Sequence, residues 1–313
     1  MTQHRIMLFG SAGQIGQAIQ HLSKKTGFPH NWELGLYSRP ECDITNPAAL
    51  RHAIQSFKPH LIINTAGITR IDEAQKNQEI AVAANFHAVA QMAAQCSTMD
   101  IPLIHISSDH VFDGEKTMPY FPDDDMDPIN HFGVTRMMGE ESIRHEMPWH
   151  VIVRTSSLFS PFRRNILTNA LKAIETLDEI RVVTDRTNGP TSAIYLAKAL
   201  AVIGTQILAG KTDGFGTFHL CGAPACSRFE FIEGVRAAYE PHTTRRPKLI
   251  PVTSAETANL AKRPAYSVLD CAKIEKVYGI TQQPWREGVA EAIDILFKGG
   301  RTPRLPHSAE QTV

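Results

Sequence analysis

Three glycines at even spacing carry the clearest chemical signal in this sequence. Gly10, Gly13 and Gly16 follow directly on an apolar run, Ile6–Phe9, and precede a helix-compatible run, Gln17–Lys25. Gly10 permits a tight turn, Gly13 lets the backbone approach a pyrophosphate, and Gly16 lets the helix pack on the strand. An anion bound there would meet unpaired N–H groups at the positive end of the helix dipole. The spacing predicts a dinucleotide-binding turn rather than a purely structural one.

A polar cluster closes a second apolar run, residues 102–109. Its members are Ser107, Ser108, Asp109 and His110. Ligands of parallel α/β sheets bind at the carboxyl ends of the strands. The glycine turn, the small residues of 64–67 (Asn-Thr-Ala-Gly) and this cluster all fall at such ends. We therefore expect them to share one site.

The choice of cofactor depends on the end of the second expected strand, residues 32–38. An acidic residue there would accept the ribose 2′-OH of NAD, but the strand ends in Tyr37-Ser38-Arg39, and no carboxylate comes before Glu41. A hydroxyl and a guanidinium suit a 2′-phosphate better. The sequence favours NADP(H), with NAD(H) as the alternative if Arg39 is only a solvated loop residue.

The elements that position these residues alternate strand and helix. Asn46 is a natural N-cap with Pro47 at the first helical position, and the apolar strands run without polar interruption, as in a parallel sheet. The sequence predicts an α/β fold, a Rossmann-type doubly wound parallel sheet followed by a smaller mixed α/β C-terminal substrate lobe. Further expected elements are a long helix containing Ala81–Cys96, a loop over 113–128, a helix over 130–145 and a strand over 150–155.

The regular alternation weakens after residue 160, which sets the expected domain boundary. Residues 1–160 form the dinucleotide-binding domain, to which the chain returns around 186–210, and 161–298 form mainly the substrate-binding lobe. The lobe is expected to hold strands at 181–184, 215–220 and 248–252 and helices at 192–206, 229–239, 270–278 and 285–298. The Pro-, Ser- and Thr-rich tail, 299–313, is expected to be disordered.

Composition excludes several classes of function. The 313 residues carry 32 Lys+Arg and 32 Asp+Glu, so no overall field favours nucleic acid or an anionic membrane. No apolar run has membrane-spanning length, and because the sequence enters a strand within its first residues we expect no signal peptide. Five scattered cysteines indicate reduced thiols in a cytoplasm. The Cys221/Cys226 spacing matches no zinc motif, so no metal site is expected.

With these features in place, the chain resembles the extended short-chain dehydrogenase/reductases, and within them the dTDP-4-dehydrorhamnose reductases. The resemblance spans about residues 5–298. It rests on GSAGQIG (10–16), DITNP (43–47), NTAGITRIDEAQ (64–75), SSDHVFDG (107–114), GVTRMMGEE (133–141), RTSSLF (154–159), NGPT (188–191) and KRPAYSVLD (262–270).

The resemblance implies hydride transfer from NADP(H) to a nucleotide-linked 4-keto sugar. Ser108 falls at the family's catalytic serine or threonine. The implied cofactor-binding residues are Gly10, Gly13, Gln14, Ile15, Gly16, Ser38, Arg39, Asp43, Ile44, Ala66, Gly67 and Arg136. The implied substrate-binding residues are Asp109, His110, Thr191, Arg263 and Ser267. A homodimer is left open, because the sequence does not give the oligomeric state.

The chain departs from the family at its acid. The family's Tyr-x-x-x-Lys falls at Phe132-x-x-x-Arg136. Phenylalanine has no proton to give, whereas arginine can still hold ribose hydroxyls. Loss of a general acid typically costs about 10²–10⁴-fold in rate. His110 or His131 is the candidate replacement, since imidazole titrates near neutrality; the alternative is that each is a polar residue at a pocket rim.

A second departure is Ser157, where the dehydrorhamnose reductases carry tryptophan; it weakens the expectation of the same sugar. Three readings follow. The chain is a reductase of a nucleotide-linked or related keto substrate with an atypical acid, a non-catalytic nucleotide-binding or regulatory protein, or an enzyme of an epimerase or dehydratase step.

Overall fold

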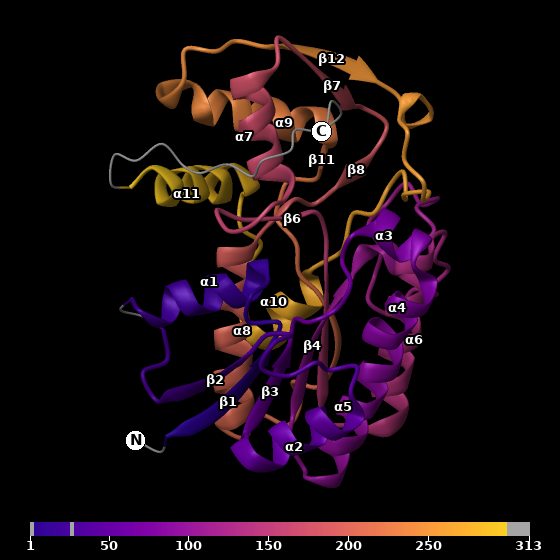
Figure 1. Ribbon diagram of the computed structural model, residues 1–313, viewed down its shortest axis with the longest axis vertical. Coiled ribbons are helices and arrows are strands. Elements are labelled where there is room, and N and C mark those ends of the chain that lie inside the picture. Colours follow the sequence, from indigo (N-terminus) through magenta and orange to yellow (C-terminus); the bar gives the residue numbers. More distant parts are fainter. Residues whose placement is uncertain (1–2, 26–27, 299–313) are drawn as a thin grey trace.

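The computed structural model describes residues 3–25 and 28–298, and the expected tail at 299–313 lies outside them. Its larger lobe is built on a six-stranded sheet with the order β10-β5-β4-β3-β1-β2, in which every neighbouring pair is parallel (Figure 1). The strands are β1 (His4–Phe9), β2 (Trp32–Tyr37), β3 (Leu61–Asn64), β4 (Leu103–Ser108), β5 (His150–Thr155) and β10 (Gly216–His219). The predicted Rossmann-type doubly wound sheet is confirmed.

Helices cover both faces of this sheet, which explains why its strands are apolar throughout. In β1, Ile6 and Leu8 pack with one set of helices, while Met7 and Phe9 pack with the other. The first set is α1 (Gln14–Ser23), α8 (Ala193–Leu208) and α10 (Ala272–Tyr278); the second is α2 (Pro47–Phe57), α5 (Ala88–Thr98) and α6 (His131–Glu146). Figure 1 shows the two sets on opposite sides of the sheet. Successive side chains of a strand point to opposite faces, so both must be apolar here.

The expected long alanine-rich helix is interrupted. The segment after β3 forms α3 (Ile71–Lys76), α4 (Gln78–Val82), a π-helical turn η1 (Ala83–His87) and then α5. The wide turn holds Asn85, whose Oδ1 accepts from the backbone N of Ile68 at 2.9 Å and whose Nδ2 donates to Thr135 Oγ1 at 3.1 Å. Such turns often occur at functional sites.

The second lobe has its own core around Phe159 and Trp285. Its helices are α7 (Ile166–Thr176), α9 (Arg228–Tyr239) and α11 (Trp285–Phe297). Short strand pairs complete it: β7 (Glu179–Val183) with β12 (Lys248–Val252), β8 (Thr187–Asn188) with β11 (Cys226–Ser227), and β6 (Leu158–Phe159) with β9 (Thr191–Ser192). Single turns of 3₁₀ helix are η2 (Asp109–Val111), η3 (Glu240–His242) and η4 (Ser254–Glu256).

More of the C-terminal half of the chain belongs to the larger lobe than the sequence indicates. The return was expected around 186–210, and α8 accounts for most of it. The expected strand at 215–220, however, is β10, which pairs with β5 in the main sheet, and α10 packs on the same core. Parallel pairing of Gly216 with Val151, 65 residues earlier, leaves no local mark in the sequence.

Candidate functional site

The glycine turn has the geometry that the spacing predicts. Gly10 has a φ of +79°, and a Cβ there would lie 2.6 Å from Thr65 Oγ1. A Cβ on Gly16 would lie 2.4 Å from the Gly10 carbonyl oxygen. Gly13 stands at the N-cap of α1 without a side-chain cap, so the first N–H groups of α1 face outward unpaired by any side chain. The turn can therefore receive an anion.

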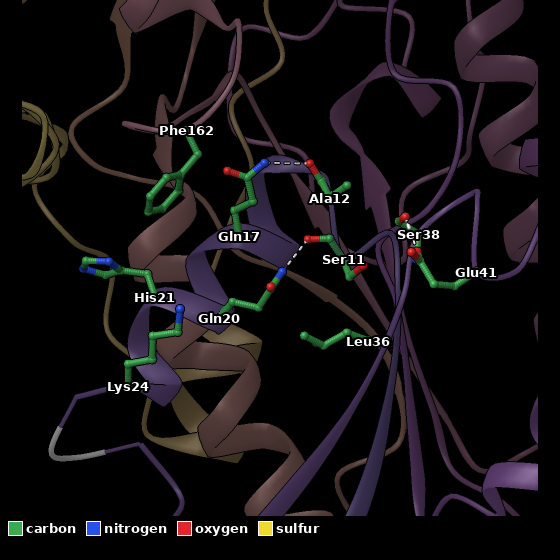
Figure 2. Close-up of a pocket in the computed structure, with 10 residues that line it drawn as sticks. All are labelled: Ser11, Ala12, Gln17, Gln20, His21, Lys24, Leu36, Ser38, Glu41 and Phe162. Atoms are coloured by element: carbon green, nitrogen blue, oxygen red, sulfur yellow. Dashed lines mark hydrogen bonds between the residues drawn. The ribbon is translucent and has the colours of Figure 1, made fainter. Parts of the chain in front are cut away.

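The pocket beside this turn is formed by α1, the end of β2 and Phe162 (Figure 2). In Figure 2, Gln17 and Gln20 reach back to the carbonyl oxygens of Ala12 and Ser11, at 2.9 and 2.7 Å. These bonds link the turn to the first helix that follows it.

Charged side chains of both signs follow the end of β2, where Ser38 and Glu41 line the pocket. The Glu41 carboxylate accepts from the backbone N of Ser38 at 2.9 Å and from the Ser38 hydroxyl, and these bonds lower the pKa of Glu41. Arg39 is 76% exposed and pairs with Asp43 at 3.2 Å. Glu41 was noted in the sequence but placed beyond the strand end, because only the turn after β2 brings its carboxylate back to Ser38.

Other residues expected at the cofactor lie close to the turn or beneath it. Gln14 Oε1 accepts from Ser160 Oγ at 2.8 Å, and the backbone N of Ala66 donates to Asn64 Oδ1 at 3.0 Å. Ile15 and Ile44 are buried in the two sheet cores. The ends of β1 and β3 lie side by side, because Phe9 pairs with Asn64 in the sheet.

The polar cluster at the end of β4 is organised by Asp109. Its buried carboxylate accepts from three hydroxyls: Ser108 at 2.9 Å, Ser156 at 2.7 Å and Ser267 at 2.6 Å. Ser267 belongs to the second lobe, so Asp109 joins the two lobes. The predicted substrate-binding residues Asp109 and Ser267 are thus held together, and Ser108 is oriented by its neighbour.

His110 lies directly against Phe132. Its ring meets the Phe132 ring edge to face, with centroids 5.5 Å apart. Asn130 Oδ1 accepts from the backbone N of Gly133, so its Nδ2 is the donor to His110 Nδ1, at 3.0 Å. With Nδ1 accepting, the neutral ring carries its proton on Nε2. Burial is the main cause that lowers the pKa of His110 from 6.5.

Arg136 lies beneath the same edge of the sheet. A Cβ on Gly67 would come within 2.9 Å of Arg136 Nη2, and Arg136 Nη1 donates to the Ile106 carbonyl at 3.2 Å. Burial lowers the pKa of Arg136 to about 10. The Arg136 Nε has no hydrogen-bond partner among the described residues. The guanidinium thus stands below the backbone that would face a nicotinamide ribose.

Two of the expected residues make contacts within the protein. His131 Nε2 lies 3.3 Å from the Gln78 carbonyl oxygen. Thr191 is fully buried, its hydroxyl donating to the Gly189 carbonyl at 3.0 Å. The Thr191 hydroxyl thus holds its own turn, and its role toward a substrate stays a prediction. Of the two candidate histidines, His110 is the one with a recorded ring contact to Phe132.

A basic cluster that the sequence did not reveal faces His110 from the second lobe. Arg186, Arg228 and Arg263 all act on the pKa of His110, and burial together with the other two arginines lowers the pKa of Arg228 to about 10. Arg263 also forms a two-pronged pair with Asp72, at 2.9 and 2.8 Å. Only Arg263 was among the predicted residues, since the three come from separate segments.

A buried ion pair fixes the loop over 113–128 beside this cluster. Arg154 Nη2 donates to Glu140 Oε2 at 2.7 Å, and its Nη1 donates to the Pro122 carbonyl at 3.1 Å. His219 Nδ1 lies 3.0 Å from the Tyr120 carbonyl. Hydrogen bonds from β5 and β10 therefore hold the loop in place.

These features define the class of the protein. A parallel doubly wound sheet with a glycine turn, a serine at the end of β4 and a second lobe that carries an arginine cluster make it an extended short-chain dehydrogenase/reductase. The chain belongs to the RmlD substrate binding domain family, whose model matches residues 4–297. It is 31% identical to a dTDP-4-dehydrorhamnose reductase of Sinorhizobium fredii, over 95% of this chain and 99% of that one. The predicted family is confirmed.

Solved structures agree. A dTDP-4-dehydrorhamnose reductase of Clostridium acetobutylicum superposes with a TM-score of 0.85 at 29% identity, covering 93% of this chain and 99% of that one. Another, from Bacillus anthracis in complex with NADP, has a TM-score of 0.83 at 26% identity and the same two coverages. These relatives support the prediction that the chain is an oxidoreductase.

Two further observations concern other classes of function. Within residues 3–25 and 28–298, no helix is long and apolar enough to cross a membrane. The same residues contain no group of three or more His, Cys, Asp or Glu placed to hold a metal ion.

Proposed function

We propose that this protein is an NADP(H)-dependent reductase of a nucleotide-linked 4-keto sugar. The observation that carries the proposal is the meeting of the glycine turn, Ser108 and His110 at one edge of the sheet. The dinucleotide would supply hydride to the keto carbon. Its pyrophosphate would be held by the N–H groups at the start of α1, and its nicotinamide ribose would lie over Gly67 and Arg136. NAD(H) is the alternative cofactor, since Glu41 stands beside Ser38.

The proton donor proposed for the nascent alkoxide is His110. Phe132 offers no hydroxyl at the family's tyrosine position, whereas the His110 ring borders it and carries its proton on Nε2. The Ser108 hydroxyl, which here donates its one proton to Asp109, would rotate to donate to the same oxygen. His110 would act as the imidazolium, or as a neutral ring that orders a water molecule, which then donates its own proton.

The substrate's diphosphate would be held by the arginine cluster. Among the described residues, Arg263 alone of the three forms an ion pair, with Asp72. Two neighbouring guanidiniums without a carboxylate partner repel each other, which costs electrostatic free energy. A bound anion would offset that repulsion. A nucleoside diphosphate group carries the matching charge and geometry.

One observation favours a second candidate, a non-catalytic nucleotide-binding protein. Phe132 has no proton to give, and the lowered pKa of His110 makes its imidazolium scarce at neutral pH. Both candidates require the cofactor site.

The experiment measures two quantities on the same preparation. One is binding of NADPH and NADH by fluorescence titration; the other is NADPH oxidation with a panel of nucleotide-linked 4-keto sugars. Oxidation with any of them supports the reductase. Binding without oxidation supports the non-catalytic candidate, and absence of binding rejects both.

The compartment is also a proposal. All five cysteines are free and buried, which supports the predicted cytoplasm. The homodimer stays a prediction.

A further inference from the structure

A segment of the second lobe, residues 160–165, reaches across to the glycine turn. Ser160 Oγ donates to Gln14 Oε1 at 2.8 Å, at the first residue of α1. Three residues later, Arg163 Nη1 donates to the carbonyl oxygen of Ala12 at 3.1 Å. Two independent contacts thus seat the segment on the turn that would receive the dinucleotide's phosphates.

Side chains at the start of α7 hold the backbone of Arg163 in position. Asn165 Nδ2 donates to the carbonyls of Ser160 at 2.9 Å and of Arg163 at 3.1 Å. Thr168 Oγ1 donates to the Arg163 carbonyl as well, at 3.1 Å. The backbone that carries the guanidinium is therefore held by the second lobe, and the guanidinium itself rests on the first.

The backbone of Arg163 is strained. Its φ of +59° lies in the left-handed region, which costs any residue with a Cβ conformational energy and favours glycine. An arginine at such a position gives up local stability. The segment's hydrogen bonds impose the conformation, and the side chain is the only feature that glycine would lack.

The charge of Arg163 is uncompensated. No carboxylate within residues 3–25 and 28–298 pairs with it, and its one protein acceptor, the Ala12 carbonyl, is shared with Gln17. The unpaired N–H groups of α1 begin two residues further along the same turn. A guanidinium beside an anion-binding turn favours the same ligand as the turn does.

We propose that Arg163 is a phosphate-binding residue of the cofactor site, contributed by the second lobe. The inference rests on the dinucleotide site of the proposed function and adds a contact that the glycine turn cannot supply. The shared chemistry is a phosphate of the dinucleotide, either its pyrophosphate or its 2′-phosphate. By holding that phosphate, Arg163 would tie the second lobe to the first whenever the cofactor is bound.

The test uses Arg163→Gly, which removes the cation and relieves the left-handed strain, so the fold is kept. The matched control is Arg181→Gly on β7, an arginine 51% exposed at the far end of the second lobe (Figure 1). Arg163→Lys keeps the charge and loses the planar fork. NADPH, NADH and ADP-ribose are titrated into each variant, and the melting temperature is recorded.

We expect Arg163→Gly to weaken NADPH binding by at least about tenfold, as for the loss of one charge-assisted contact. Its melting temperature should not fall, Arg163→Lys should bind with intermediate affinity, and Arg181→Gly should bind as the parent does. Equal losses for NADPH, NADH and ADP-ribose assign the pyrophosphate, whereas a loss for NADPH alone assigns the 2′-phosphate.

Parent-like affinity of Arg163→Gly for all three ligands overturns the inference while leaving the proposed function intact. A parent that binds none of the three removes the proposed function itself.

Discussion

His110 and Phe132 meet edge to face, with ring centroids 5.5 Å apart, where the family has its tyrosine. The contact puts an imidazole beside the place that a phenol hydroxyl would occupy. His110→Ala should therefore lower kcat by at least about tenfold, in the range for a lost acid catalyst, with cofactor affinity nearly unchanged. Steady-state kinetics and NADPH titration measure the two effects separately.

His131→Ala is the matched control, because that ring lies against the Gln78 carbonyl instead. It should change kcat little. A larger loss for His131→Ala than for His110→Ala would contradict the assignment.

A second test of the same site restores the family's tyrosine and lysine at positions 132 and 136. Phe132→Tyr with Arg136→Lys should give a small gain if His110 already donates the proton. In a decayed enzyme with an intact pocket, the same double variant should raise activity from nothing. A parent that binds NADPH, never oxidises it and stays inert after the double substitution would end the reductase proposal.

The pH profile should show where His110 titrates. Burial, with further lowering by Arg263, Arg186 and Arg228 against the opposing charge of Asp109, sets its pKa below 6.5. If the imidazolium is the donor, kcat is highest below that pKa and falls as pH rises through it. We expect the fall on the acid side of pH 6.5, measured as kcat at saturating substrate. A fall centred well above this value would assign the donor to another group.

The sequence predicted the features that are local. The glycine turn, the Asn46 cap with its bonds to Ala48 and Ala49, and the buried strands each follow from a few adjacent residues. What it missed depends on contacts between distant segments. Arg186 and Arg228 join Arg263 only through the tertiary fold, and the π-helical turn at Asn85 serves bonds to Ile68 and Thr135. Composition and spacing do not predict such contacts between distant segments.

The ion pair behind the site should dominate local stability. Glu140 is fully buried, and although burial raises its pKa, the opposing charge and hydrogen bonds of Arg154 outweigh this, so the pKa is lowered. Glu140→Gln leaves Arg154 buried without a counter-charge and should cost about 3–5 kcal/mol of unfolding free energy. Chemical denaturation at pH 7 measures it.

The stability prediction for Glu140→Gln has a matched control and a defined pH dependence. Asp294→Asn breaks the exposed pair with Lys298 and should cost only about 0–1 kcal/mol. Because the folded pKa of Glu140 is depressed, its contribution is complete above the unfolded pKa and is lost as pH falls through the folded one. The gap between parent and Glu140→Gln should narrow in acid; a gap that widens would show that the carboxylate is not stabilised by its partner.

The last prediction concerns the choice between NADPH and NADH. Glu41 accepts a hydrogen bond from the Ser38 hydroxyl, and its carboxylate would repel a 2′-phosphate. Arg39 is exposed and pairs with Asp43, and its guanidinium would have to leave that pair to bind the phosphate. Glu41→Gln should shift the ratio of affinities toward NADPH by about tenfold, and Arg39→Ala should shift it toward NADH by a similar factor, as one charge-assisted contact of roughly 1.5–3 kcal/mol allows. Titration of both cofactors into both variants gives the ratios. If Glu41→Gln weakens NADH alone, the carboxylate accepts the ribose hydroxyls and the natural cofactor is NAD(H). An unchanged ratio in Arg39→Ala would remove Arg39 from the site, and with it the sequence argument for the 2′-phosphate.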